Sequence, residues 1–128
     1  MLIKFSVKSF KNFDETIELN LKAADYEFNC AAVKNHYVNT GIIYGANASG
    51  KTNFIYALMD ITTHVTDFNK TNIRYKHYVN MDGDSKYAQF TYHFLLEGQR
   101  CVYTYEKEDM NQLLYERLEI NDALIFEY

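Results

Sequence analysis

Residues 45–52 read GANASGKT, and this run limits the possible folds of the chain more than any other segment does. The run has the pattern Gly-x-x-x-x-Gly-Lys-Thr. The residues before it, 39–44, read NTGIIY and predict a short buried strand. After it, apolar residues recur at three- and four-residue spacing and predict a helix over 51–65: Phe54, Leu58, Ile61 and Val65. The sequence therefore predicts a strand, a glycine-rich turn and a helix in that order.

A turn of this kind, called a P-loop, binds phosphate through its backbone. Successive N–H groups from Gly45 to Gly50 can surround an anion, and the following helix adds its N-terminal amides and its positive dipole end. Gly50 has no Cβ, so the backbone can approach closely there. Lys51 can reach the β- and γ-phosphates, and the Thr52 hydroxyl can bind Mg²⁺. The predicted ligand is a nucleoside triphosphate with Mg²⁺.

Length and composition fit one domain. The 128 residues are 48% hydrophobic and 23% charged, which is typical of a globular chain. The net charge of −4 gives no general nucleic-acid signal. Two small basic groups could still contact a nucleic-acid backbone, although a solvated polar face is the favoured interpretation of both. They are Lys4, Lys8 and Lys11, and Lys70, Arg74 and Lys76 among Phe68, Tyr75 and Tyr78.

Cysteine and histidine usage indicates neither a disulfide framework nor a zinc site. Cys30 and Cys101 are the two cysteines, and with no signal peptide at the start we expect reduced thiols and a cytoplasmic location. The histidines show no metal-ligand spacing with them. No apolar run is long enough to span a bilayer.

The rest of the chain alternates apolar and polar residues, which is typical of strands. Residues 1–9 and 16–22 predict an antiparallel pair, and 23–38 predicts a loop with a helical turn near Ala24. Further strands are expected over 88–96, 101–105, 114–120 and 124–128, with turns at 97–98, 109–111 and 121–122. The last strand runs to the final residue, which indicates a fragment.

Three features resemble the N-terminal lobe of the SMC/RecF-like ABC-type ATPases. Among these the resemblance is greatest to bacterial ATP-binding proteins related to the overcoming-lysogenisation-defect (OLD) nucleases, many of them linked to phage defence. The features are the corner Phe10-Lys11-Asn12-Phe13, the extended loop 45–53 with the form G-x-N-x-S-G-K-T-N, and the aromatic-rich antiparallel strands that follow the helix.

The resemblance implies an α/β fold in which a P-loop half-domain has a mixed, mainly antiparallel sheet wrapped around one helix. Residues 1–128 would form a single N-terminal ATP-binding lobe with ATP and Mg²⁺ as cofactors. Thr52 would bind Mg²⁺. The implied nucleotide-contacting residues are Gly45, Ala46, Asn47, Ala48, Ser49, Gly50, Lys51, Thr52, Asn53, Lys11 and Asn12.

Some of these residues have a plainer alternative role. Lys11 and Asn12 could form a solvated turn, and Asn47 could make hydrogen bonds only inside the loop. Relatives often carry Gly where this chain has Ala48. Because a positive φ would cost energy at alanine, we expect φ to be negative at Ala48.

The chain lacks the motifs that complete such an ATPase. It has no signature motif, no Walker B strand ending in Asp-Glu, and no marked Gln loop or switch His; residues 123–127 are the nearest to a Walker B run. Hydrolysis needs a metal-positioning acid and a group that orients water. The chain alone should therefore hydrolyse ATP poorly or not at all, whereas a full-length protein with a C-terminal lobe would be an ATPase.

Three functions remain open from the sequence. In the first hypothesis the chain is one lobe of an ATPase that acts on DNA or RNA, as in repair or phage defence. Its partners would be the second lobe of the same head and a second head, with ATP held between the two heads of a homodimer. In the second hypothesis the chain is a stand-alone kinase or GTPase, which the missing Walker B acid and the missing Asn-Lys-x-Asp motif disfavour. Or it is a non-enzymatic dimerisation or interaction module with an idle P-loop.

Overall fold

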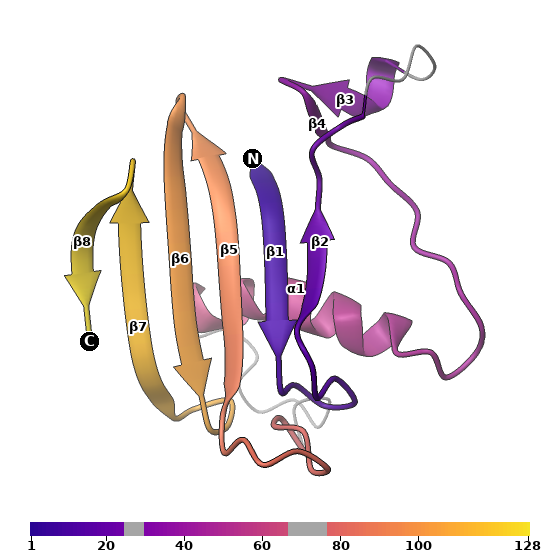
Figure 1. The fold of residues 1–128 in the computed structure, drawn as a ribbon, viewed down its shortest axis with the longest axis vertical. Helices are drawn as coiled ribbons and strands as arrows, with labels where there is room; N and C mark the ends of the chain where they lie inside the picture. The colour runs from indigo at the N-terminus through magenta and orange to yellow at the C-terminus, as the bar shows by residue number, and fades with distance from the viewer. Residues whose placement is uncertain (25–29, 67–76) are drawn as a thin grey trace.

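The computed structural model describes residues 1–24, 30–66 and 77–128, and it is a mixed α/β fold of mostly antiparallel strands with one α-helix (Figure 1). Its helix is α1 (Lys51–Thr66), and a 3-10 turn spans Cys30–Ala32. The strands are β1 (Leu2–Lys8), β2 (Ile17–Asn20), β3 (Val33–Lys34), β4 (Tyr37–Val38), β5 (Ala88–Leu96), β6 (Gln99–Lys107), β7 (Leu113–Ile120) and β8 (Ala123–Glu127).

Six strands form one sheet in the order β2-β1-β5-β6-β7-β8, and β3 pairs with β4 separately. All described pairs are antiparallel, so the sheet is not mixed as predicted. The predicted pairing of the first two strands is confirmed, with Phe5 opposite Leu19. The turns at 97–98 and 121–122 are also confirmed. Both residues of each turn have positive φ, which is the conformation that two-residue hairpins favour.

The core lies between the sheet and α1, which runs across the strands on one face (Figure 1). Alternate residues of β1 are buried, as the period-two pattern predicts: Ile3, Phe5 and Val7. Aromatic rings from neighbouring strands complete this core, with Phe5 and Tyr92 centroids 4.8 Å apart and Phe90 and Tyr105 centroids 5.0 Å apart. These rings fill much of the space beneath the helix.

Helix α1 confirms the prediction for 51–65 and extends it by one residue. Its buried face joins the sheet through polar atoms as well as apolar ones, because Tyr92 Oη donates to the Ala57 carbonyl at 2.8 Å. At 16 residues, α1 is not long and apolar enough to cross a membrane, and it is the one α-helix of the described residues.

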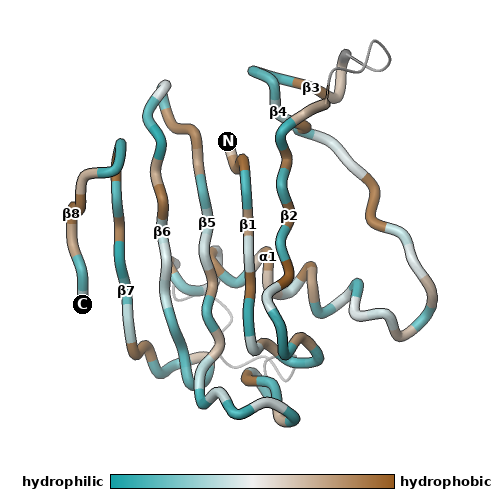
Figure 2. The backbone as a smooth tube through the Cα atoms, in the orientation of Figure 1, coloured by the Kyte–Doolittle hydropathy of each residue, from teal (hydrophilic) through white to brown (hydrophobic). Residues whose placement is uncertain are grey.

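The predicted strand over 39–44 is wrong. These residues take no strand conformation, and Ile42 and Tyr44 are each 90% exposed. Figure 2 shows a hydrophobic stretch on this connection between β4 and α1, away from the sheet. A single extended segment without a neighbouring strand leaves its backbone groups without ladder partners. Among the described residues, no strand lies beside it.

The interpretation of 23–38 as a loop is also corrected in part. Residues 33–38 form the short hairpin of β3 and β4, in which Val33 pairs with Val38. The one short helical turn described in this region is at Cys30–Ala32 rather than near Ala24, and residues 25–29 lie outside the described part of the chain.

Candidate functional site

The glycine-rich loop and the start of α1 line an open depression of about 490 Å³. Eight of the eleven predicted contact residues line it: Asn12, Asn47, Ala48, Ser49, Gly50, Lys51, Thr52 and Asn53. Gly45, Ala46 and Lys11 do not line it. The structure therefore brings the corner between β1 and β2 to the same place as the loop, although the two segments are far apart in the sequence.

Gly50 is required by two features of the structure. Its φ is +91°, in the left-handed region that glycine adopts most readily. A Cβ at this position would also lie 2.5 Å from Asn12 Nδ2 and 3.0 Å from the Phe13 ring. The first helical hydrogen bond follows at once, from Phe54 N to Gly50 O at 2.8 Å. The amides of the first turn precede that bond and have no carbonyl partner inside the helix.

Lys51 holds the beginning of the loop. Its ammonium group donates to the carbonyl oxygens of Gly45 at 2.7 Å and Ala46 at 2.6 Å. The Ser49 amide donates to Ala46 O at 3.4 Å, so the loop closes on itself over these residues. This arrangement places the positive charge of Lys51 over the loop backbone, beside the depression that an anion would enter.

The expectation of a negative φ at Ala48 is wrong, because φ is +62° there. The loop must turn sharply between Asn47 and Gly50 to reach the start of α1, and a left-handed residue makes that turn. For an L-residue with a Cβ this conformation costs about 1–2 kcal/mol. Ala48 therefore occupies a position that glycine would fill without strain.

Of the two predicted contact residues between β1 and β2, Asn12 lies at the depression, whereas Lys11 is not part of its lining. Asn12 lines the depression, and its Oδ1 accepts a hydrogen bond from Asn53 Nδ2 at 2.7 Å. Lys11 has φ +52°, and its ammonium lies 5.6 Å from the centroid of the Phe10 ring. Burial lowers the pKa of Lys11 below its usual value. Phe13, which covers Gly50, was not predicted as a site residue, although it belongs to the Phe10-Lys11-Asn12-Phe13 pattern.

The depression has the charge of an anion site. Lys51 is the one charged residue among the described residues that line it, and the helix dipole adds positive potential. The Thr52 side chain is exposed, so its hydroxyl is accessible to a metal ion. No carboxylate lines the depression within the described part of the chain. The lining is therefore compatible with an anion, since the one charged group among its described residues is a cation.

A buried ion pair connects α1 to the sheet, and sequence reasoning missed it. Asp60 Oδ2 accepts hydrogen bonds from Lys107 Nζ at 3.1 Å and from Tyr105 Oη at 2.8 Å, and both charged groups are almost fully buried. One turn further on, His64 stacks on Tyr105 with centroids 4.2 Å apart. Removing either partner of such a pair leaves a buried charge unpaired, so the pair fixes how α1 lies on the sheet.

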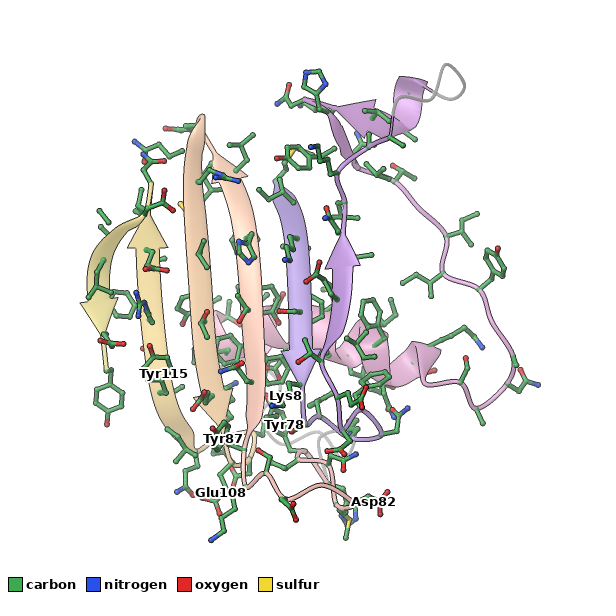
Figure 3. The ribbon with its side chains drawn as sticks, in the orientation of Figure 1. Lys8, Tyr78, Asp82, Tyr87, Glu108 and Tyr115 are labelled. Carbon is green, nitrogen blue, oxygen red and sulfur yellow. The ribbon has the colours of Figure 1, made fainter. Side chains whose placement is uncertain are left out.

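In the first predicted basic group, Lys4 and Lys8 lie on the face of β1 away from the core. Lys4 pairs with Glu18 at 2.9 Å, whereas Lys8 is exposed at the end of β1. Tyr78, labelled in Figure 3, is buried. The remaining members of the second group lie outside the described residues: Phe68, Lys70, Arg74, Tyr75 and Lys76.

Comparison of the chain with protein-family models and with curated protein sequences gives no match.

Proposed function

We propose that the chain is the nucleotide-binding lobe of an SMC/RecF-like ABC-type ATPase and that it binds Mg²⁺·ATP at residues 45–53. One observation carries the proposal. A glycine with φ +91° leads directly into the 16-residue helix α1, and Lys51 in the first turn places its ammonium on the loop's own carbonyls. A triphosphate needs this combination of backbone donors, a mobile cation and a helix N-terminus.

Binding would exchange the contacts of Lys51. Its ammonium would leave the carbonyls of Gly45 and Ala46 and pair with the β- and γ-phosphates, because phosphate oxygens carry the negative charge that carbonyl oxygens lack. The amides of residues 46–52 would surround the phosphates, and Thr52 Oγ1 would bind Mg²⁺. Asn12 and Asn47, which line the depression, would contact the nucleotide, and so would Lys11 from the segment between β1 and β2.

Completion of the ATPase requires groups that the described residues do not provide. We propose that a second lobe supplies the acid and the base. Two heads would then close on ATP and form a homodimer. This dimer would drive a DNA- or RNA-directed process in the cytoplasm, such as repair or phage defence. The apolar side chains beside the loop support such a partner. Ile42 and Tyr44 are exposed, as are Ile55 and Met59 on α1, and a neighbouring lobe would cover them.

A titration with a fluorescent ATP analogue and Mg²⁺ tests the nucleotide site. We expect Lys51→Ala to weaken binding by at least about tenfold, since a hydrogen bond to a charged group contributes about 1.5–3 kcal/mol. Lys86→Ala is the matched control, because Lys86 is an exposed lysine away from the loop. Equal affinities for the wild type and Lys51→Ala would remove the proposal.

That negative result would favour the second candidate, a dimerisation or interaction module with an idle P-loop. The observation behind this candidate is that exposed apolar residues lie just before a loop whose lysine is bonded to its own backbone: Ile42, Ile43 and Tyr44. The two functions differ in whether Lys51 affects nucleotide affinity.

A further inference from the structure

We infer that Asn80 is a positioning residue for the P-loop, which it influences through the corner between β1 and β2. The corner is defined here as residues 9–14, and the segment 78–84 before β5 is called the support loop. The inference rests on the proposed nucleotide site and adds a residue distant from it in sequence. Figure 1 shows the support loop beside the corner at the lower edge of the sheet, and a bridge between Phe10 and Val79 joins them.

Asn80 is buried, and every polar group of its side chain is used. Its Oδ1 accepts hydrogen bonds from the amides of Asp82 at 2.9 Å and Gly83 at 2.8 Å. Its Nδ2 donates to the Lys11 carbonyl at 2.7 Å. The oxygen therefore shapes the support loop, whereas the nitrogen reaches across to the corner.

The backbone strengthens the same connection. The Asn80 amide donates to Ser9 O at 2.9 Å, and the Lys11 amide donates to Tyr78 O at 3.0 Å. A Cβ added to Gly83 would collide with Asp14 Oδ1. The support loop and the corner are thus in close backbone contact at several points, and a shift of one requires a shift of the other.

The corner in turn touches the P-loop at the two residues that follow Lys11. Asn12 accepts a hydrogen bond from Asn53 and lies against Gly50, and the Phe13 ring lies against Gly50 as well. Lys11, whose carbonyl Asn80 holds, is the residue directly before Asn12. Asn80 consequently sets where Asn12 and Phe13 meet the loop, and this contact fixes the position of the loop backbone around its ligand.

Two variants test whether Asn80 acts through the Lys11 carbonyl or only by shaping the support loop. Asn80→Asp keeps the Oδ1 acceptor that shapes the support loop but loses the donor to Lys11 O, whereas Asn80→Ala loses both. We expect both to weaken Mg²⁺·ATP binding by about three- to tenfold, the equivalent of one hydrogen bond. We also expect both to move the ¹⁵N–¹H resonances of the Asn53 side-chain amide and the Gly50 backbone amide. Asn111→Asp is the charge-matched control on an exposed turn.

A double-mutant cycle with Asn12→Ala tests the route. If Asn80 acts through the corner, Asn80→Asp has a smaller effect on ATP affinity once Asn12 is alanine, because only the Phe13 contact with the loop remains. An equal loss in both backgrounds, or unchanged affinity and Asn53 resonances in Asn80→Asp, would overturn the inference. If the wild type shows no Lys51-dependent binding, the proposed function fails separately, and the Asn53 and Gly50 resonances alone decide whether Asn80 positions the loop.

Discussion

Ala48 shows how a single residue can match a motif and still be strained within it. Its position in the loop satisfies the Gly-x-x-x-x-Gly-Lys-Thr pattern, which leaves it unspecified, yet the backbone there is left-handed. Strain of this kind persists where the surrounding structure determines the conformation. Here the Lys51 bonds to Gly45 and Ala46 on one side, and the corner against Gly50 on the other, fix both ends of the turn.

Replacing Ala48 by glycine should therefore stabilise the protein. We expect Ala48→Gly to raise the free energy of unfolding by about 0.5–1 kcal/mol, because relief of the left-handed strain exceeds the entropy that glycine adds to the unfolded chain. Urea unfolding measures the change. Ala46→Gly is the matched control, since Ala46 has no positive φ, and it should be neutral or destabilising. The same response in both variants would contradict the strain.

At the residue scale, the sequence predicted which side chains form the loop but not what holds them. The loop residues could be named because they match a short motif. Phe13 and Asn80 could not, because their roles arise from contacts between segments separated by tens of residues. The same is true of Asp60 and Lys107, whose burial as a pair depends on how α1 crosses β6.

At the element scale, periodicity was sufficient for α1 and for β1, β5 and β6, which place residues in the core, and it also predicted β8, whose five residues are all exposed. It failed for 39–44, where the apolar run predicts a buried strand but no neighbouring strand is described. A strand depends on its neighbours, whereas a helix satisfies its own backbone. That difference explains why the helix after the loop was predicted correctly and the strand before it was not.

Helix α1 also makes stability sensitive to pH through His64. Its Nε2 lies 2.8 Å from Tyr103 Oη, and it stacks on Tyr105. Burial, followed by the charge of Lys107, lowers the pKa of His64 below the usual 6.5, against the opposing effects of Glu116 and Asp60. The folded state therefore binds this proton more weakly than the unfolded state does. Its contribution to stability is complete above pH 6.5 and is lost as the pH falls below it.

We expect the free energy of unfolding to decrease between pH 7.5 and pH 5, and His64→Gln to reduce this decrease. Some pH dependence should remain, because burial also lowers the pKa of His93, with Lys4 and Arg100 acting in the same direction. Urea unfolding at both pH values measures it. His36→Gln is the control at an exposed histidine, and a slope for His64→Gln equal to that of His36→Gln would exclude His64 as the source.

At the scale of the whole molecule, the core and the exposed apolar residues occupy separate places. The core lies between α1 and the middle of the sheet, whereas Ile42 and Tyr44 lie before the loop and make little contact with the fold. Side chains with such high exposure contribute little to the stability of the isolated chain. Under the proposed function, a second lobe of the same head or a second copy of the chain would cover them.

Removing these two side chains should therefore affect association and not folding. We expect Ile42→Ser with Tyr44→Ser to change the free energy of unfolding by less than about 0.5 kcal/mol for each substitution, and to abolish any concentration-dependent association seen by sedimentation velocity. Val7→Ser, at a buried position of β1, is the contrasting variant and should be strongly destabilising. A large loss of stability in the double variant would mean that residues 42–44 pack against the fold in solution, and the surface beside the loop would then be part of the domain and not a site for a partner.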